Sequence, residues 1–169
     1  KHPEVALLIK TALVLLVVST IGVWSLGPLT FSGGRSSTLY QLAIQFYLHF
    51  QFHGWFTLSL LALLLDVITR NSQFNSTTFK RFYAMLLISV VLTYGLVLEW
   101  GLGGTTPLIL NGVGLVSQLM ALLLFFRLIR GNRPDSFLKK SPISKAFLSF
   151  GLLSWIFKVI IKTAVLLTA

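Results

Sequence analysis

Five long apolar stretches decide what this chain can fold into. Each approaches the roughly 20 apolar residues that an α-helix needs to cross a hydrocarbon core about 30 Å thick. Backbone amides cannot stay unpaired in lipid, and the alternating pattern of a membrane barrel does not occur. The sequence therefore predicts an all-α, polytopic integral membrane bundle. We expect one transmembrane domain over residues 1–169 with five spans, at 5–26, 39–68, 82–100, 107–128 and 146–167.

Composition agrees with this fold class. Of the 169 residues, 55% are apolar and 11% are charged, whereas about a quarter of an ordinary soluble domain is charged. The connections carry turn-forming residues, at Gly27 and Pro28, at Gly33 and Gly34, and over 71–78, 101–107 and 131–142. Because residue 1 is Lys and no basic or aromatic anchor follows the last span, we expect a processed chain or part of a longer one.

The distribution of basic residues predicts the orientation in the membrane. Assigning the loops alternately to two sides collects eleven basic residues on one side and leaves Arg35 on the other. The eleven are Lys1, Lys10, Arg70, Lys80, Arg81, Arg127, Arg130, Arg133, Lys139, Lys140 and Lys145. Basic residues mark the cytoplasmic side, so we expect a cytoplasmic amino terminus and an outside carboxyl terminus, in a bacterial inner membrane. Topology and contact with anionic lipids explain the net charge of +10, and nucleic acid is not an expected partner.

A stripe of polar side chains runs through the second stretch: Gln41, Gln45, His49 and His53. A step of four residues turns an α-helix by about 400°, so these groups share one slowly drifting face. Both imidazoles lie near mid-span. Ionisable groups at that depth usually point into a bundle or a cavity, which makes a functional site the default hypothesis.

The two histidines allow more than one interpretation. Four residues apart, His49 and His53 can bind one transition-metal ion, or each can face a separate group such as a haem iron. Alternatively, they only form hydrogen bonds with neighbouring helices. The remaining histidine is His2, at the edge of the first span. A haem with two imidazole ligands inside this chain is therefore not expected, which leaves a five-coordinate haem or one shared with another subunit.

Polar residues on other spans extend the candidate site. Lys158 and Lys162 could lie near a haem propionate or a lipid phosphate, or they could extend to the headgroup region. On the fourth span, Asn111 and Gln118 either pack against neighbouring helices or line a substrate path together with the histidine stripe. Asp66 is expected to pair with Arg70 at the inner boundary.

Conventional enzyme motifs are sparse in this sequence. The pair of histidines falls short of the histidine boxes of membrane desaturases and lacks the glutamate and third ligand of a zinc protease. The glycine-rich segment 101–104 follows a helix rather than a strand, so the context of a phosphate-binding loop is missing. The absence of cysteine excludes disulfides and iron–sulfur clusters within the chain. We do not expect this chain to catalyse a reaction alone.

Two short motifs carry a resemblance to a known family. Residues 47–56, YLHFQFHGWF, resemble a segment of bacterial multi-spanning membrane proteins that are distantly similar to haem-copper oxidase subunit I. Separately, residues 2–5, HPEV, are similar to an element of that superfamily whose histidine binds copper. The resemblance implies a respiratory-type helical protein that bears haem, with or without copper. It implies a haem or metal role for His49 and a copper role for His2.

Taken together, these observations predict an integral membrane subunit of a respiratory or redox-type complex, with a haem or transition-metal site on the second helix. Two other classes stay open. A structural subunit without a cofactor would pack the polar stripe against a partner, and a transporter or channel segment would use it as a lining. In each case we expect membrane lipids and other membrane subunits as partners.

Overall fold

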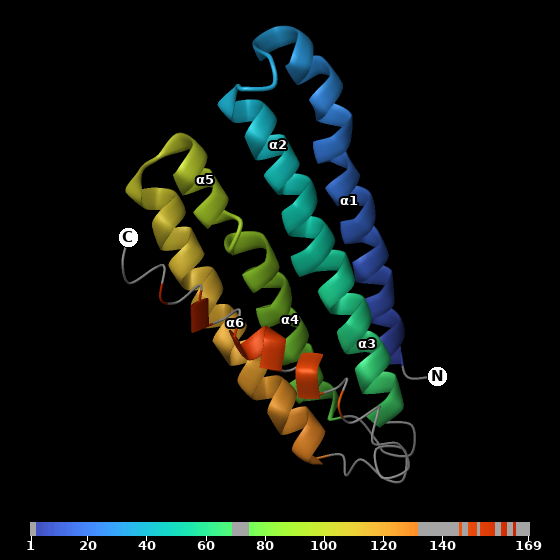
Figure 1. Cartoon of the computed structure of the whole chain (residues 1–169). Helices are drawn as coiled ribbons and strands as arrows, with labels where there is room; N and C mark the ends of the chain where they lie inside the picture. The colour runs from blue at the N-terminus through green and yellow to red at the C-terminus, as the bar shows by residue number, and fades with distance from the viewer. Residues whose placement is uncertain are drawn as a thin grey trace.

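The protein is entirely helical in the parts that the structure describes. The structure is a computed structural model, and it describes residues 3–68, 75–131, 146, 149–151, 153–157, 160, 161 and 164. The elements in chain order are α1 (Pro3–Gly33), α2 (Thr38–His49), the π-helix η1 (Phe50–Phe56), α3 (Thr57–Ile68), α4 (Ser76–Leu92), α5 (Gly95–Leu102) and α6 (Thr105–Gly131). Figure 1 shows them as long rods lying side by side.

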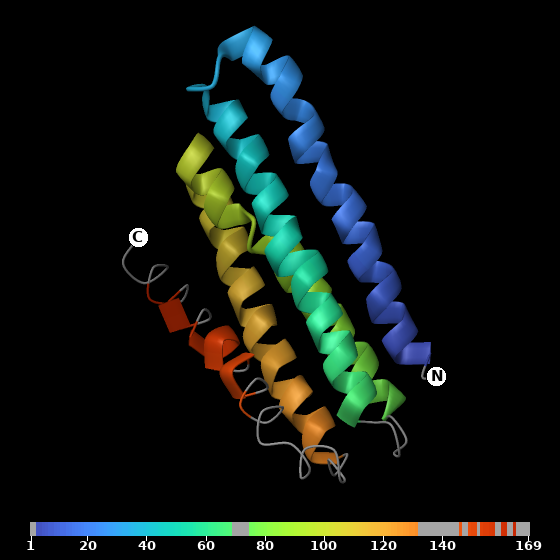
Figure 2. The ribbon, with the colours of Figure 1, turned by 45° about the vertical axis from the view of Figure 1, so that its right-hand side comes forward.

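Four segments of the described chain are long and apolar enough to cross a membrane. They run over Pro3–Gly33, Thr38–Asp66, Ser76–Leu102 and Thr105–Arg130. The prediction of a polytopic helical membrane protein is confirmed to this extent. The predicted fifth span, 146–167, lies largely outside the described residues, so the number five stays a prediction. Those of its residues that are described as helical lie beside α6 (Figures 1 and 2).

The helices form two hairpins. In the first hairpin, α1 packs along α2, η1 and α3, and in the second, α4 and α5 pack along α6. Contacts between the hairpins are fewer and join α2 to α5, η1 to α4, and α1 to α4. We call this contact surface the seam. Figure 2 shows α1 on the far side of the first hairpin, away from α6.

The first helix is longer than the sequence predicted. A turn was expected at Gly27 and Pro28, but α1 continues through Pro28 to Gly33. Proline has no N–H, so the bond to the carbonyl four residues earlier, that of Trp24, is lost, and the ring crowds that carbonyl. Trp24 lies exposed in the second half of α1. One missing bond there does not stop the helix, which ends where Gly34 adopts a φ of 73°.

The third span also begins earlier than predicted, at Ser76 instead of residue 82. Asn75 is the N-cap of α4, and its side-chain oxygen accepts a hydrogen bond of 3.0 Å from the N–H of Thr78. Such a cap stabilises a helix by about 1 kcal/mol. The predicted loop 71–78 therefore ends at Asn75.

Large aromatic side chains form the core between the two hairpins. Phe79, Phe82 and Phe125 are almost completely buried, together with Leu8, Leu58 and Leu65. The rings of Phe82 and Phe125 lie 5.6 Å apart, and Trp155 from the predicted fifth span meets Phe125 edge-to-face at 6.0 Å. This packing holds α1, α3, α4 and α6 against one another.

A glycine allows the closest approach within the first hairpin. A Cβ atom on Gly22 of α1 would lie 2.5 Å from the Ala43 carbonyl oxygen and 2.9 Å from the Tyr47 nitrogen, both on α2. Only a residue without a side chain fits at that distance. Small residues serve the same purpose at helix crossings throughout membrane proteins, because they let backbones come close together.

Candidate functional site

The second span changes from α- to π-helix where its histidines lie. The π-helix η1 covers seven residues, from Phe50 to Phe56, and includes His53, while His49 directly precedes it. Stretches of π-helix are rare and often occur at functional sites. At the end of η1 the N–H of Thr57 bonds the Gly54 carbonyl, and the Thr57 hydroxyl donates to the Phe52 carbonyl at 2.7 Å. The change of helix type thus leaves the Phe52 oxygen paired, as a lipid environment requires.

The third span breaks across the seam from the π-helix. α4 ends at Leu92 and α5 begins at Gly95. At the break the N–H of Tyr94 bonds the Val91 carbonyl at 3.3 Å instead of the Val90 carbonyl, which would be its α-helical partner. The Val90 oxygen therefore loses its partner within the helix.

His49 replaces that partner. Its Nε2 atom lies 2.8 Å from the Val90 carbonyl oxygen, across the seam. A carbonyl can only accept, so Nε2 carries the proton and donates it. The His49 side chain is 6% exposed. His49 thus makes the interhelical hydrogen bond that the sequence offered as one interpretation of the histidines.

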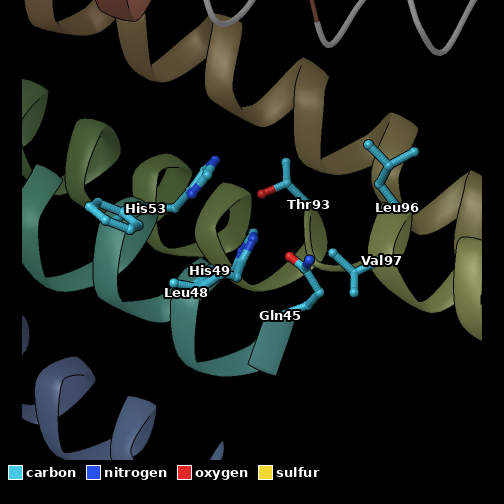
Figure 3. Close-up of a pocket in the computed structure, with 8 residues that line it drawn as sticks. Gln45, Leu48, His49, His53, Thr93, Leu96 and Val97 are labelled. Carbon is cyan, nitrogen blue, oxygen red and sulfur yellow. The ribbon is translucent and has the colours of Figure 1, made fainter. Parts of the chain in front are cut away.

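The two imidazoles lie stacked on each other. The ring centroids of His49 and His53 are 4.6 Å apart and their planes differ by 8° (Figure 3). A metal ion is bound in the plane of an imidazole, about 2.0–2.1 Å from its nitrogen. One ion cannot lie in two separate parallel planes. Within the described ranges, no group of three histidine, cysteine, aspartate or glutamate side chains converges either. In this arrangement the two rings do not fit a shared ion.

A haem fits this arrangement no better. An axial bond to His49 through Nε2 would require that atom to leave the Val90 carbonyl. The pocket beside the histidines has a volume of about 190 Å³, below the roughly 300 Å³ at which pockets for drug-sized ligands begin. The ligand roles of His49 and His53 stay predictions. His2, Lys158 and Lys162 lie outside the described residues, and so do their predicted roles.

This pocket lies at the seam, and we call it the histidine pocket. Its lining comes from α2, η1, the break and α5: Gln45, Leu48, His49, Phe52, His53, Thr93, Leu96 and Val97. Figure 3 shows His49 and His53 parallel on one side and Thr93 opposite them. Leu48 and Phe52 are 36% and 57% exposed. The pocket therefore opens at the surface of the bundle, near the middle of the candidate span Thr38–Asp66.

The polar stripe divides along its length. Gln45, His49 and His53 line the histidine pocket together. Gln41 does not line it, and its Nε2 atom donates to the Arg35 carbonyl at 3.2 Å in the turn before α2. Of the four residues in the predicted stripe, three thus line the histidine pocket, and the fourth, Gln41, bonds the turn before α2.

Gln118 lines a second, smaller cavity beside the histidine pocket. We call it the inner cavity. It measures about 10 Å³ and is lined by His53, Thr57, Leu86, Ser89, Val90, Thr93, Gln118 and Trp155. His53 and Thr93 line both spaces. Asn111 is fully buried but lines neither of them. The substrate path along Asn111, Gln118 and the histidine stripe stays a prediction.

Sequence reasoning missed the residues at the break in the third span. The Tyr94 hydroxyl donates to the Leu42 carbonyl at 3.1 Å across the seam, and its ring lies 5.4 Å from that of His49. The Thr93 hydroxyl donates to the Ser89 carbonyl at 2.7 Å. The triplet Thr93-Tyr94-Gly95 inside an apolar run was the signal that could have revealed the break.

Comparisons with protein-family models, with curated proteins and with solved structures give no match for this chain. The likeness to haem-copper oxidase subunit I therefore remains a resemblance of short motifs.

Proposed function

We propose that this chain is an integral membrane subunit of a redox-type assembly, and that its histidine pocket binds the headgroup of a membrane quinone or quinol. One observation carries the proposal: a pocket lined by both polar and apolar side chains opens beside the exposed Leu48 and Phe52, near the middle of the candidate span Thr38–Asp66. A ligand dissolved in the bilayer can enter such a pocket from the side.

The lining matches the chemistry of a single-ring headgroup. Leu48, Phe52, Leu96 and Val97 supply apolar walls for the ring. The Gln45 amide can both donate and accept a hydrogen bond. Because the Thr93 hydroxyl donates its proton to the Ser89 carbonyl, its oxygen is left as an acceptor. About 190 Å³ suits one ring, and the long tail of such a ligand would stay in the lipid.

The redox part of the proposal comes from the sequence. The resemblance of residues 47–56 implies a respiratory-type assembly, and quinones are the lipid-soluble redox carriers of such assemblies. A bound haem is not needed for this role. If a haem belongs to the assembly, the fit of the described residues favours its binding elsewhere.

The arrangement of the helices supports the predicted orientation. Lys10 lies in the early part of α1, Lys80 and Arg81 in the early part of α4, and Arg127 and Arg130 at the end of α6. In two antiparallel hairpins these positions fall at one end of the bundle, and Arg35 falls at the other (Figure 1). We propose that the basic end is cytoplasmic.

Ligand-induced stabilisation tests the quinone site. The purified protein in lipid nanodiscs is heated with and without decylubiquinone. A ligand at 100 times its Kd stabilises the folded state by about 2.7 kcal/mol, which raises Tm by about 5–11 °C at roughly 2–4 °C per kcal/mol. Val97→Phe places a ring in the histidine pocket and should abolish the rise.

A matched variant controls for the added ring. Val91→Phe makes the same change on α4 at a side chain that is exposed and does not line the pocket. It should keep the full rise in Tm. No rise in the wild-type protein, or an equal rise in both variants, would refute the quinone site.

A further inference from the structure

The inner cavity contains buried polar atoms that the protein itself does not pair. Gln118 and Trp155 are 5% and 8% exposed. The Gln118 Oε1 atom and the Trp155 Nε1 atom both lack a hydrogen-bond partner in the structure, and both residues line the inner cavity. One atom is an acceptor and the other is a donor.

Leaving such groups unpaired is costly. A buried donor or acceptor without a partner destabilises the folded state by about 1–3 kcal/mol. In native proteins these groups are therefore usually satisfied, often by an ordered water molecule. The Trp155 indole N–H and the Gln118 oxygen do not bond each other, although one is a donor and the other an acceptor. A molecule between them that both donates and accepts would satisfy both.

The inner cavity has the size and the chemistry for one water molecule. Its volume of about 10 Å³ corresponds to roughly one water-sized probe. A water there would accept from the indole N–H of Trp155 and donate to Gln118 Oε1. Ser89 and Thr93 donate their hydroxyl protons to the Leu86 and Ser89 carbonyls, so each hydroxyl oxygen can accept the second water proton. Three partners are typical of a buried water.

We propose that the inner cavity holds one long-lived water molecule, bonded to Trp155, Gln118 and a hydroxyl of α4. This water ties the predicted fifth span, through Trp155, to α4 and α6. Thr93 lines both spaces. The water therefore also extends the polar surface of the histidine pocket into the bundle. The proposal does not depend on quinone binding.

Magnetisation transfer from water tests this site in the full chain. The protein is labelled with ¹⁵N in its tryptophan indoles, and Trp155→Phe identifies the resonance of Trp155. We expect a water cross-peak at the Trp155 indole proton with the sign of a long-lived contact. A Trp155 indole that shows cross-peaks only to lipid or detergent acyl chains would overturn the proposal.

Two variants on α6 show whether Gln118 holds the water. Gln118→Met keeps the volume of the side chain and removes the acceptor, so the water cross-peak should fall at least several-fold. Ser117→Ala is the matched control, because the Ser117 hydroxyl bonds the Val113 carbonyl of its own helix. It should leave the cross-peak unchanged. An unchanged cross-peak in Gln118→Met would overturn the proposed bonding.

A second measurement covers the case in which Gln118→Met perturbs the fold. Unfolding midpoints are compared for Gln118→Met, Trp155→Phe and the double variant. If one water links the two side chains, the second substitution should shift the midpoint less when the first is already present. Fully additive shifts would contradict a shared water. Neither result bears on decylubiquinone binding, so the two proposals can fail separately.

Discussion

Replacing His49 by phenylalanine removes its hydrogen bond to the Val90 carbonyl across the seam. Phenylalanine keeps an aromatic ring of similar shape beside His53 and leaves no large cavity, but it has no N–H for the Val90 carbonyl. That carbonyl has already lost its helical partner at the break between α4 and α5. The variant therefore removes the bond and leaves a buried acceptor unpaired.

The expected loss of stability follows from that geometry. An unpaired buried acceptor costs about 1–3 kcal/mol, whereas interhelical hydrogen bonds within membranes average about 0.6 kcal/mol and reach about 1.7. The Val90 oxygen has no helical alternative, so we expect the upper part of the membrane range, about 1.5 kcal/mol. At roughly 2–4 °C per kcal/mol, Tm should fall by about 3–6 °C.

Reversible unfolding in mixed micelles, followed by circular dichroism, measures this loss directly. His49→Gln retains an N–H donor and should recover part of the stability. Tyr94→Phe removes a different hydrogen bond of the seam, but its acceptor, the Leu42 carbonyl, lies within α2. It should cost less than His49→Phe. If His49→Phe and the wild-type protein have the same Tm, the bond to Val90 does not stabilise the seam and the reasoning fails.

Three further predictions concern packing, cofactor content and orientation. A Cβ atom on Gly95 would lie 2.5 Å from a carbonyl oxygen of α6, while one on Gly27 would meet nothing within 4 Å. Thermal unfolding should therefore show that Gly95→Ala destabilises the protein by about 1–3 kcal/mol and that Gly27→Ala does not. The visible spectrum of the purified protein should lack a Soret band, because Nε2 of His49 is engaged, whereas a Soret band that weakens in His49→Ala would restore the haem assignment. Since the chain has no cysteine, single variants report orientation: an impermeant maleimide added to intact cells should label Ser36→Cys and spare Ser76→Cys, and the reverse pattern would invert the topology.

The candidate site shows where sequence reasoning succeeds and where it stops. The four-residue spacing predicts that Gln45, His49 and His53 share one helix face, because a side chain's direction follows from helical geometry, and all three line the histidine pocket. The same reasoning placed Gln41 there, although the Arg35 carbonyl of the adjacent turn engages it. A periodic pattern gives direction, but it does not say which neighbour a side chain will meet.

The metal and haem interpretations of His49 and His53 depended on which neighbours the two rings meet, and a periodic pattern does not give this. Two histidines four residues apart can converge on an ion or stack, and local sequence does not distinguish the outcomes. The π-helix η1 and the Val90 carbonyl left unpaired at the break favour stacking and an interhelical bond. Both features need the two hairpins to be side by side.

The sequence by itself determined the membrane-spanning helices, because long apolar runs in lipid have no other way to pair their backbone amides. It also placed the histidines near the middle of the second span and most basic residues at one end of the bundle. Only the tertiary structure decided the break at Thr93 and Tyr94, the π-helix opposite it and the pocket between them. Such irregular backbone is stable inside a membrane only where another helix supplies the missing partners, and the chain must be folded before that helix is in place.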